Sequence, residues 1–255
     1  MVPAQETARR VEDEFPEFAG GVEMTWQVVA RLGQLSRAPV QAALWQQVRR
    51  GALDFAGLAS VVGALAGFFT IATTEVGFGL GVSVGVQILR VLVLGQLAGF
   101  VCALLLVAGP GTAATYELGL MRHSGELRTL RLIGIDPRDY LMLPRVLGFA
   151  LSLFLLSVVF QASAVFGGAA LAAVATSLTF SQQIEALATT LDPVALMVSV
   201  LDSLVVGSVV GSLVCRYGLR PEFTPEEMPR IAQRLLGGAL VAFVLVHGGA
   251  ALLLS

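Results

Sequence analysis

Long apolar runs alternate with short polar segments along this chain, and the lengths of the runs indicate its class. A bilayer core of roughly 30 Å takes about 20 apolar helical residues to cross. The run at about Leu147–Thr176 is longer than one crossing needs, so it should tilt or project beyond the bilayer. The pattern predicts an all-α, polytopic membrane protein with five transmembrane helices. We expect them at about Leu53–Thr73, Ile88–Val107, Leu147–Thr176, Val194–Cys215 and Leu235–Leu254.

A compact polar segment, Thr115–Arg145, separates the second run from the third. Its first part has helical periodicity and predicts a helix at about residues 115–133, ended by Gly134. Apolar residues recur along one side of this helix, and Arg122 and Glu126 form an i,i+4 pair. A solvated connector and a partner-docking helix both fit. The apolar stripe, which would otherwise face water, favours docking.

Residues 1–52 form a separate N-terminal region ahead of a transmembrane domain at residues 53–255. Within it, Glu23–Arg50 has apolar residues at three- and four-residue steps, which predicts an amphipathic helix lying in the membrane interface. Pro39 should break or kink that helix. A cytoplasmic helical hairpin is the alternative. The acidic, polar N-terminus does not resemble a cleavable signal peptide.

The arginines indicate the orientation. All sixteen basic residues are Arg. Six precede the first span, five follow the second and four lie between the fourth and fifth, whereas Arg90 alone falls on the opposite side. Basic residues concentrate in cytoplasmic loops. We therefore expect a cytoplasmic N-terminus and a C-terminus on the opposite side, which requires an odd number of spans.

Composition narrows the function. Hydrophobic residues make up 56% of the chain and charged residues 13%, compared with roughly 25% charged in soluble domains. The net charge of −2 argues against nucleic acid as a partner. The sequence contains no phosphate-binding loop, HExxH motif or metal-ligand spacing. We expect neither a catalytic nor a metal site in this chain, and no enzyme activity of its own.

Two ionisable residues fall inside the predicted spans. Asp202 in the fourth and His247 in the fifth lie at similar depths, roughly 12 Å from the outer ends, so they could form a polar pair. Charged groups inside membranes face a bundle interior or a wet cavity. A structural pair joining two helices is favoured over a proton relay.

Three motifs carry a family resemblance: Glu117–Arg122 (ELGLMR), Gly134–Pro137 (GIDP) and Leu143–Arg145 (LPR). With this spacing the chain resembles the MlaE/YrbE permeases, membrane subunits of Mla- and Mce-type ABC transporters that move lipids between bacterial membranes. The resemblance implies a homodimer in the bacterial inner membrane, with its C-terminus in the periplasm. It also implies a helix seated on a cytoplasmic ATPase that binds the ATP, and a periplasmic MCE-type lipid-binding partner.

The resemblance also suggests site residues. Those expected to contact the ATPase are Glu117, Met121, Arg122, Glu126 and Leu130. Gln96 and Leu97 would line a lipid cavity at the dimer interface. The chain departs from the family pattern by having Gly95–Gly99 (GQLAG) for an R-E-L-G-P motif, Gly109 for an arginine and Asp202 for a lysine. These departures leave open whether it pairs with itself or with a different permease copy.

The leading hypothesis is the permease subunit of a lipid-transporting ABC complex. One alternative is an ion-coupled secondary transporter that uses Asp202 and His247. Another is a membrane scaffold that transports nothing.

Overall fold

The computed structural model describes residues 38–74, 87–132, 134, 138–175, 181–182, 184–185, 193–220 and 224–254. Most of the predicted interfacial helix, up to residue 37, therefore lies outside the described residues.

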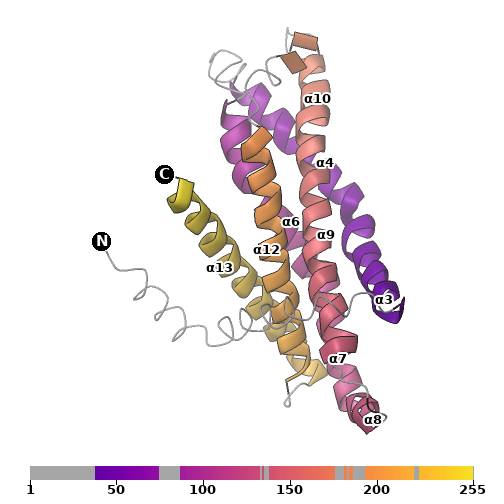
Figure 1. The fold of residues 1–255 in the computed structure, drawn as a ribbon. Helices are drawn as coiled ribbons and strands as arrows, with labels where there is room; N and C mark the ends of the chain where they lie inside the picture. Colours follow the sequence, from indigo (N-terminus) through magenta and orange to yellow (C-terminus); the bar gives the residue numbers. More distant parts are fainter. Residues whose placement is uncertain are drawn as a thin grey trace.

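The described part of the chain is helical throughout and contains no strand. Five of its helices are long and apolar enough to cross a membrane, which confirms the predicted all-α, five-span fold. They run over Gln41–Ala72, Leu89–His123, Tyr140–Val174, Met197–Gly218 and Met228–Gly248. Figure 1 shows them side by side, with α4 and α13 toward opposite edges.

The first spanning helix consists of α3 (Ala38–Val48), a π-helical segment η2 (Arg49–Leu53) and α4 (Asp54–Ala72). Residues 38–52, which the sequence analysis assigned to the N-terminal region, are continuous with the first spanning helix. Pro39 lies in the first turn of α3, where proline is tolerated, and no further proline follows up to Ala72. Gly51 lies against Ser152 of the third spanning helix, so close that no side chain would fit between them. The first and third spanning helices are therefore closely packed at Gly51.

The second spanning helix is also continuous. It consists of η4 (Leu89–Leu97), α6 (Ala98–Leu106), η5 (Val107–Gly111) and α7 (Thr112–His123). Its 35 residues span about 52 Å, compared with a bilayer core of roughly 30 Å. One end must therefore project from the membrane, and α7 is the polar end.

The single helix expected at residues 115–133 is instead two helices. α7 ends at His123 and α8 (Glu126–Leu132) follows after a turn. Gly125 in that turn has a φ of +81°, a conformation that favours glycine. A left-handed residue cannot continue an α-helix, so the polar segment bends here.

Two helices form the centre of the bundle. The third spanning helix contains η6 (Arg138–Met142), α9 (Leu143–Ala162), η7 (Ser163–Gly167) and α10 (Gly168–Ala175). The fourth is α12 (Pro193–Gly218), and it packs along α9. Gly207 and Gly211 of α12 lie directly against the α9 backbone at Ala150 and Val146. Small residues therefore set the close approach of this pair.

The fifth spanning helix, α13 (Met228–Leu254), follows the short 3₁₀ helix η8 (Pro225–Glu227) and packs mainly on α12. Its outward side chains Leu240, Val244 and Leu245 are exposed, as are Leu58, Val61 and Phe69 of α4. Exposed large apolar residues on opposite edges of a membrane bundle are suited to contact with lipid.

Candidate functional site at the polar elbow

We call residues 112–132, which comprise α7, the turn at Gly125 and α8, the elbow. Glu117 on α7 links it to two other spanning helices. Its carboxylate accepts a hydrogen bond from Arg50 at 3.0 Å and another from Arg145 at 3.3 Å. Arg50 belongs to the first spanning helix and Arg145 to the third. Glu117, predicted as an ATPase contact, is therefore also an internal tie between helices.

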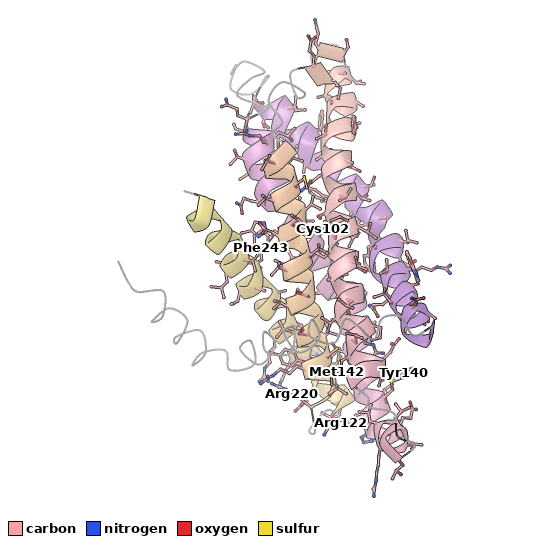
Figure 2. The ribbon with its side chains drawn as sticks, in the orientation of Figure 1. Cys102, Arg122, Tyr140, Met142, Arg220 and Phe243 are labelled. Atoms are coloured by element: carbon pink, nitrogen blue, oxygen red, sulfur yellow. The ribbon has the colours of Figure 1, made fainter. Side chains whose placement is uncertain are left out.

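Arg122 makes a second tie. Its guanidinium donates a hydrogen bond to the carbonyl oxygen of Leu219, at the end of the fourth spanning helix. Nearby, Arg220 lies over the ring of Tyr217, 4.6 Å from its centroid. Figure 2 shows Arg122, Tyr140, Met142 and Arg220 gathered at the elbow end of the bundle. The long, positively charged side chains are thus concentrated where α7 leaves the apolar core.

A shallow hollow lies on the elbow. Its volume is about 350 Å³, and it opens at the bend between α7 and α8. It is lined by Glu117, Leu120, Met121, His123, Ser124 and Glu126. A hollow that combines the apolar Leu120 and Met121 with acidic side chains can accept an apolar side chain of a partner together with a basic one beside it.

The hollow brings together three of the five residues expected to contact a partner: Glu117, Met121 and Glu126. Arg122 turns toward Leu219 instead, and Leu130 is half-buried on α8 and outside the lining. The sequence reasoning missed Leu120, His123 and Ser124. The signal that could have identified them is Gly125, because a glycine between two short helical patterns indicates a turn.

Gln96 and Leu97 end the π-helical segment η4, far from the elbow along the same helix. The Gln96 side chain is exposed, whereas Leu97 is half-buried and packs against the apolar core. Their contact with lipid stays a prediction.

The predicted polar pair is not joined in the structure. Among the described residues, no direct hydrogen bond or ion pair connects Asp202 to His247, although the two groups lie close enough to interact electrostatically. The ring nitrogens of His247 are buried and make no well-formed hydrogen bond, but the backbone of Phe243 and of Gly95 lies near them. The imidazole stacks on Phe243 with 4.1 Å between ring centroids. It also lies beside Gly99 of α6. Ring stacking and close packing thus contribute to holding this histidine in place.

Gly109, which stands where the resemblance suggested an arginine, has no room for a side chain. The ring of Phe55 occupies the space that even a Cβ atom would need. The first and second spanning helices thus meet through an aromatic ring at this point. A charged side chain here would require Phe55 to move.

A bundle of five apolar helices with a projecting polar elbow defines a polytopic membrane protein with no strand in its described part. A profile of the family described as Permease MlaE matches residues 44–252. The match covers most of the chain, including the elbow and all five spanning helices. The chain therefore belongs to the MlaE permease family.

Two curated proteins are similar to parts of the chain. The intermembrane phospholipid transport system permease protein MlaE of Haemophilus influenzae is 33% identical over 82 residues, which cover 32% of this chain and 31% of that protein. The chloroplastic protein TRIGALACTOSYLDIACYLGLYCEROL 1 of Arabidopsis thaliana is 26% identical over 124 residues, covering 49% and 35% respectively. The matched segments thus span about a third of each relative.

Proposed function

We propose that this chain is the membrane-spanning subunit of an ABC transporter that moves phospholipid between bacterial membranes. A separate cytoplasmic subunit would bind and hydrolyse ATP. Support comes from membership of the MlaE permease family and from the similarity to the Haemophilus phospholipid transport permease. The five apolar helices provide the membrane domain that such a role needs.

The observation that carries the proposal is the elbow. The second spanning helix is longer than the bilayer core and projects α7 and α8 beyond the apolar bundle. The hollow there combines an exposed acid, Glu126, with the half-buried apolar Met121. Ties from Glu117 and Arg122 fix α7 to neighbouring helices, so a contact at the hollow reaches the membrane domain directly.

The same proposal assigns an orientation and partners. The elbow and N-terminus would face the cytoplasm and the C-terminus the periplasm, as the arginine distribution predicts. A second permease copy would pair with this one in the inner membrane. A lipid would lie beside Gln96 and Leu97 and pass to or from a periplasmic MCE-type protein.

Purification in mild detergent, followed by identification of bound protein and lipid, tests the proposal. Glu126→Lys places a cation on the rim of the hollow and should abolish co-purification of a P-loop ATPase. Glu226→Lys is the matched control. Glu226 is an exposed acid of η8 at the same end of the bundle but outside the hollow, so the partner should be retained.

Phospholipid in the extract of the unchanged protein supports a lipid permease. Uptake driven by a proton gradient without ATP, and lost in Asp202→Asn, would contradict the proposal and favour a secondary transporter. Purification with neither ATPase nor lipid would favour a scaffold.

A further inference from the structure

Three hydrogen bonds inside the bundle form a closed ring that includes one backbone carbonyl oxygen. The Leu94 carbonyl oxygen accepts from the Ser199 hydroxyl at 3.0 Å and from the Gln161 amide at 3.2 Å. The Gln161 amide also donates to the Ser199 hydroxyl oxygen at 3.1 Å. All three residues are buried. Three different spanning helices therefore meet at this carbonyl.

The donors are themselves held in place. One helical turn away on both helices, the Ser203 hydroxyl donates to the Ser157 hydroxyl at 3.0 Å. Ser157 and Gln161 lie on α9, whereas Ser199 and Ser203 lie on α12. Water cannot replace such bonds in the hydrocarbon region, so they persist as long as α9 and α12 stay packed.

The helix that contains Leu94 is π-helical at this level, as are η2, η5, η6 and η7 elsewhere in the described residues. Leu89–Leu97 is π-helical, and the Ala98 N–H donates to the carbonyl of Val93, five residues back. A π-helical segment accommodates one residue more than an α-helix would. The side chains that follow the segment are therefore rotated about the helix axis by about 100° relative to those that precede it. Gln96 and Leu97 lie at its end.

We propose that Gln161 and Ser199 are positioning residues that hold Leu89–Leu97 in its π-helical register and thereby set the direction in which Gln96 and Leu97 point. The two donors fix the Leu94 carbonyl from outside its own helix, two residues before Gln96. The inference rests on the proposed function only for the assignment of Gln96 and Leu97 to a lipid contact. The hydrogen bonds themselves are independent of it.

A spin label at residue 96 tests the register. Cys102 and Cys215, the other cysteines of the chain, are both buried, so a thiol introduced by Gln96→Cys can be labelled selectively. With the full-length protein in phospholipid nanodiscs, Ser199→Ala and Gln161→Met should shift the mobility of the label and its accessibility to oxygen. A second label at the exposed Val61 of α4 should remain unchanged in every variant.

Ser212→Ala is the matched control. Ser212 is a buried serine of the same helix whose hydroxyl bonds within α12, to the Ser208 carbonyl at 2.9 Å. Its loss removes a buried hydroxyl without affecting Leu94, so the label at residue 96 should not shift. The inference would be overturned if the label shifted equally in Ser212→Ala and Ser199→Ala. It would also be overturned if the label shifted in neither Ser199→Ala nor Gln161→Met.

Phospholipid bound per protein, measured with Gln96 intact, separates the inference from the proposed function. Less lipid in Ser199→Ala than in Ser212→Ala supports a positioning role at a lipid contact. No lipid in the unchanged protein would contradict the proposed function, while the label would still decide whether Gln161 and Ser199 set the register. Ser199→Ala, the smaller change, keeps the test available if Gln161→Met does not fold.

Discussion

Glu117 and Arg145 form an ion pair at 3.3 Å between the elbow and the third spanning helix. The Arg145 side chain is only 12% exposed, and its second terminal nitrogen, Nη1, is buried without a partner among the described residues. Glu117 is therefore the carboxylate that compensates a largely buried positive charge. This role is additional to the partner contact that the sequence analysis predicted.

Glu117→Gln should lower the thermal unfolding temperature, because it removes the negative charge that Arg145 faces. The expected loss is about 1–2 kcal/mol, below the roughly 3–5 kcal/mol of a fully buried pair, because Glu117 is itself half-exposed. Circular dichroism in detergent measures it. Glu226→Gln, which changes an exposed acid outside the elbow, is the control. Equal melting temperatures for Glu117→Gln and the control would show that the tie contributes nothing to stability.

Gly125→Ala should strain the bend between α7 and α8. An L side chain at a φ of +81° costs about 1–2 kcal/mol. No atom would contact the new methyl group, so the effect is conformational and local. Hydrogen exchange should become faster in Glu126–Leu132 while α9 and α12 keep their protection. Gly57→Ala, on an open face of α4, should leave exchange unchanged. Unaltered exchange in α8 would show that the bend does not depend on glycine.

Gly67→Ala should separate α4 from the third spanning helix. A Cβ atom at this position would collide with the backbone carbonyl of Ala164, and backbone cannot rotate away as a side chain can. We expect a destabilisation of about 1–3 kcal/mol, typical of overpacking. The yield of folded protein in size-exclusion chromatography and the unfolding temperature measure it. Gly57→Ala is again the matched control on the same helix. Equal folded yields and unfolding temperatures in the two variants would contradict the close contact between Gly67 and Ala164.

His247→Leu should not destabilise the bundle and should preserve ATP-driven lipid movement. A buried imidazole that makes no well-formed hydrogen bond contributes mainly packing, and an apolar side chain of similar size avoids burying poorly paired nitrogens. Thermal unfolding and a vesicle-based lipid transfer assay with the partner ATPase check the two parts. Loss of transfer with an unchanged unfolding temperature would indicate a direct role for His247.

The sequence was sufficient to predict five spanning helices, because an apolar run of about 20 residues is a local and nearly unambiguous signal. It was less reliable for where helices end. Gly51 was accommodated inside a continuous helix and Gly125 broke one, yet both are glycines among polar residues. The difference lies in tertiary packing on Ser152, which no local pattern contains.

The partners of the polar side chains were also beyond local patterns. Glu117 is bonded to an arginine 67 residues earlier and to another 28 residues later. Sequence spacing predicted an i,i+4 pair of Arg122 with Glu126, but Arg122 reaches the Leu219 carbonyl. The ring at Leu94 was not predicted at all, since Gln161 and Ser199 lie 38 residues apart and become neighbours only when α9 packs on α12.

The ties at α7 have a mechanical consequence. Arg50, Arg145 and Leu219 connect the first, third and fourth spanning helices to one stretch of the second. Three spanning helices are thereby bonded directly to α7, which itself belongs to the second, rather than each being reached through its neighbour. A rotation of α7 would therefore act on all four spanning helices at once.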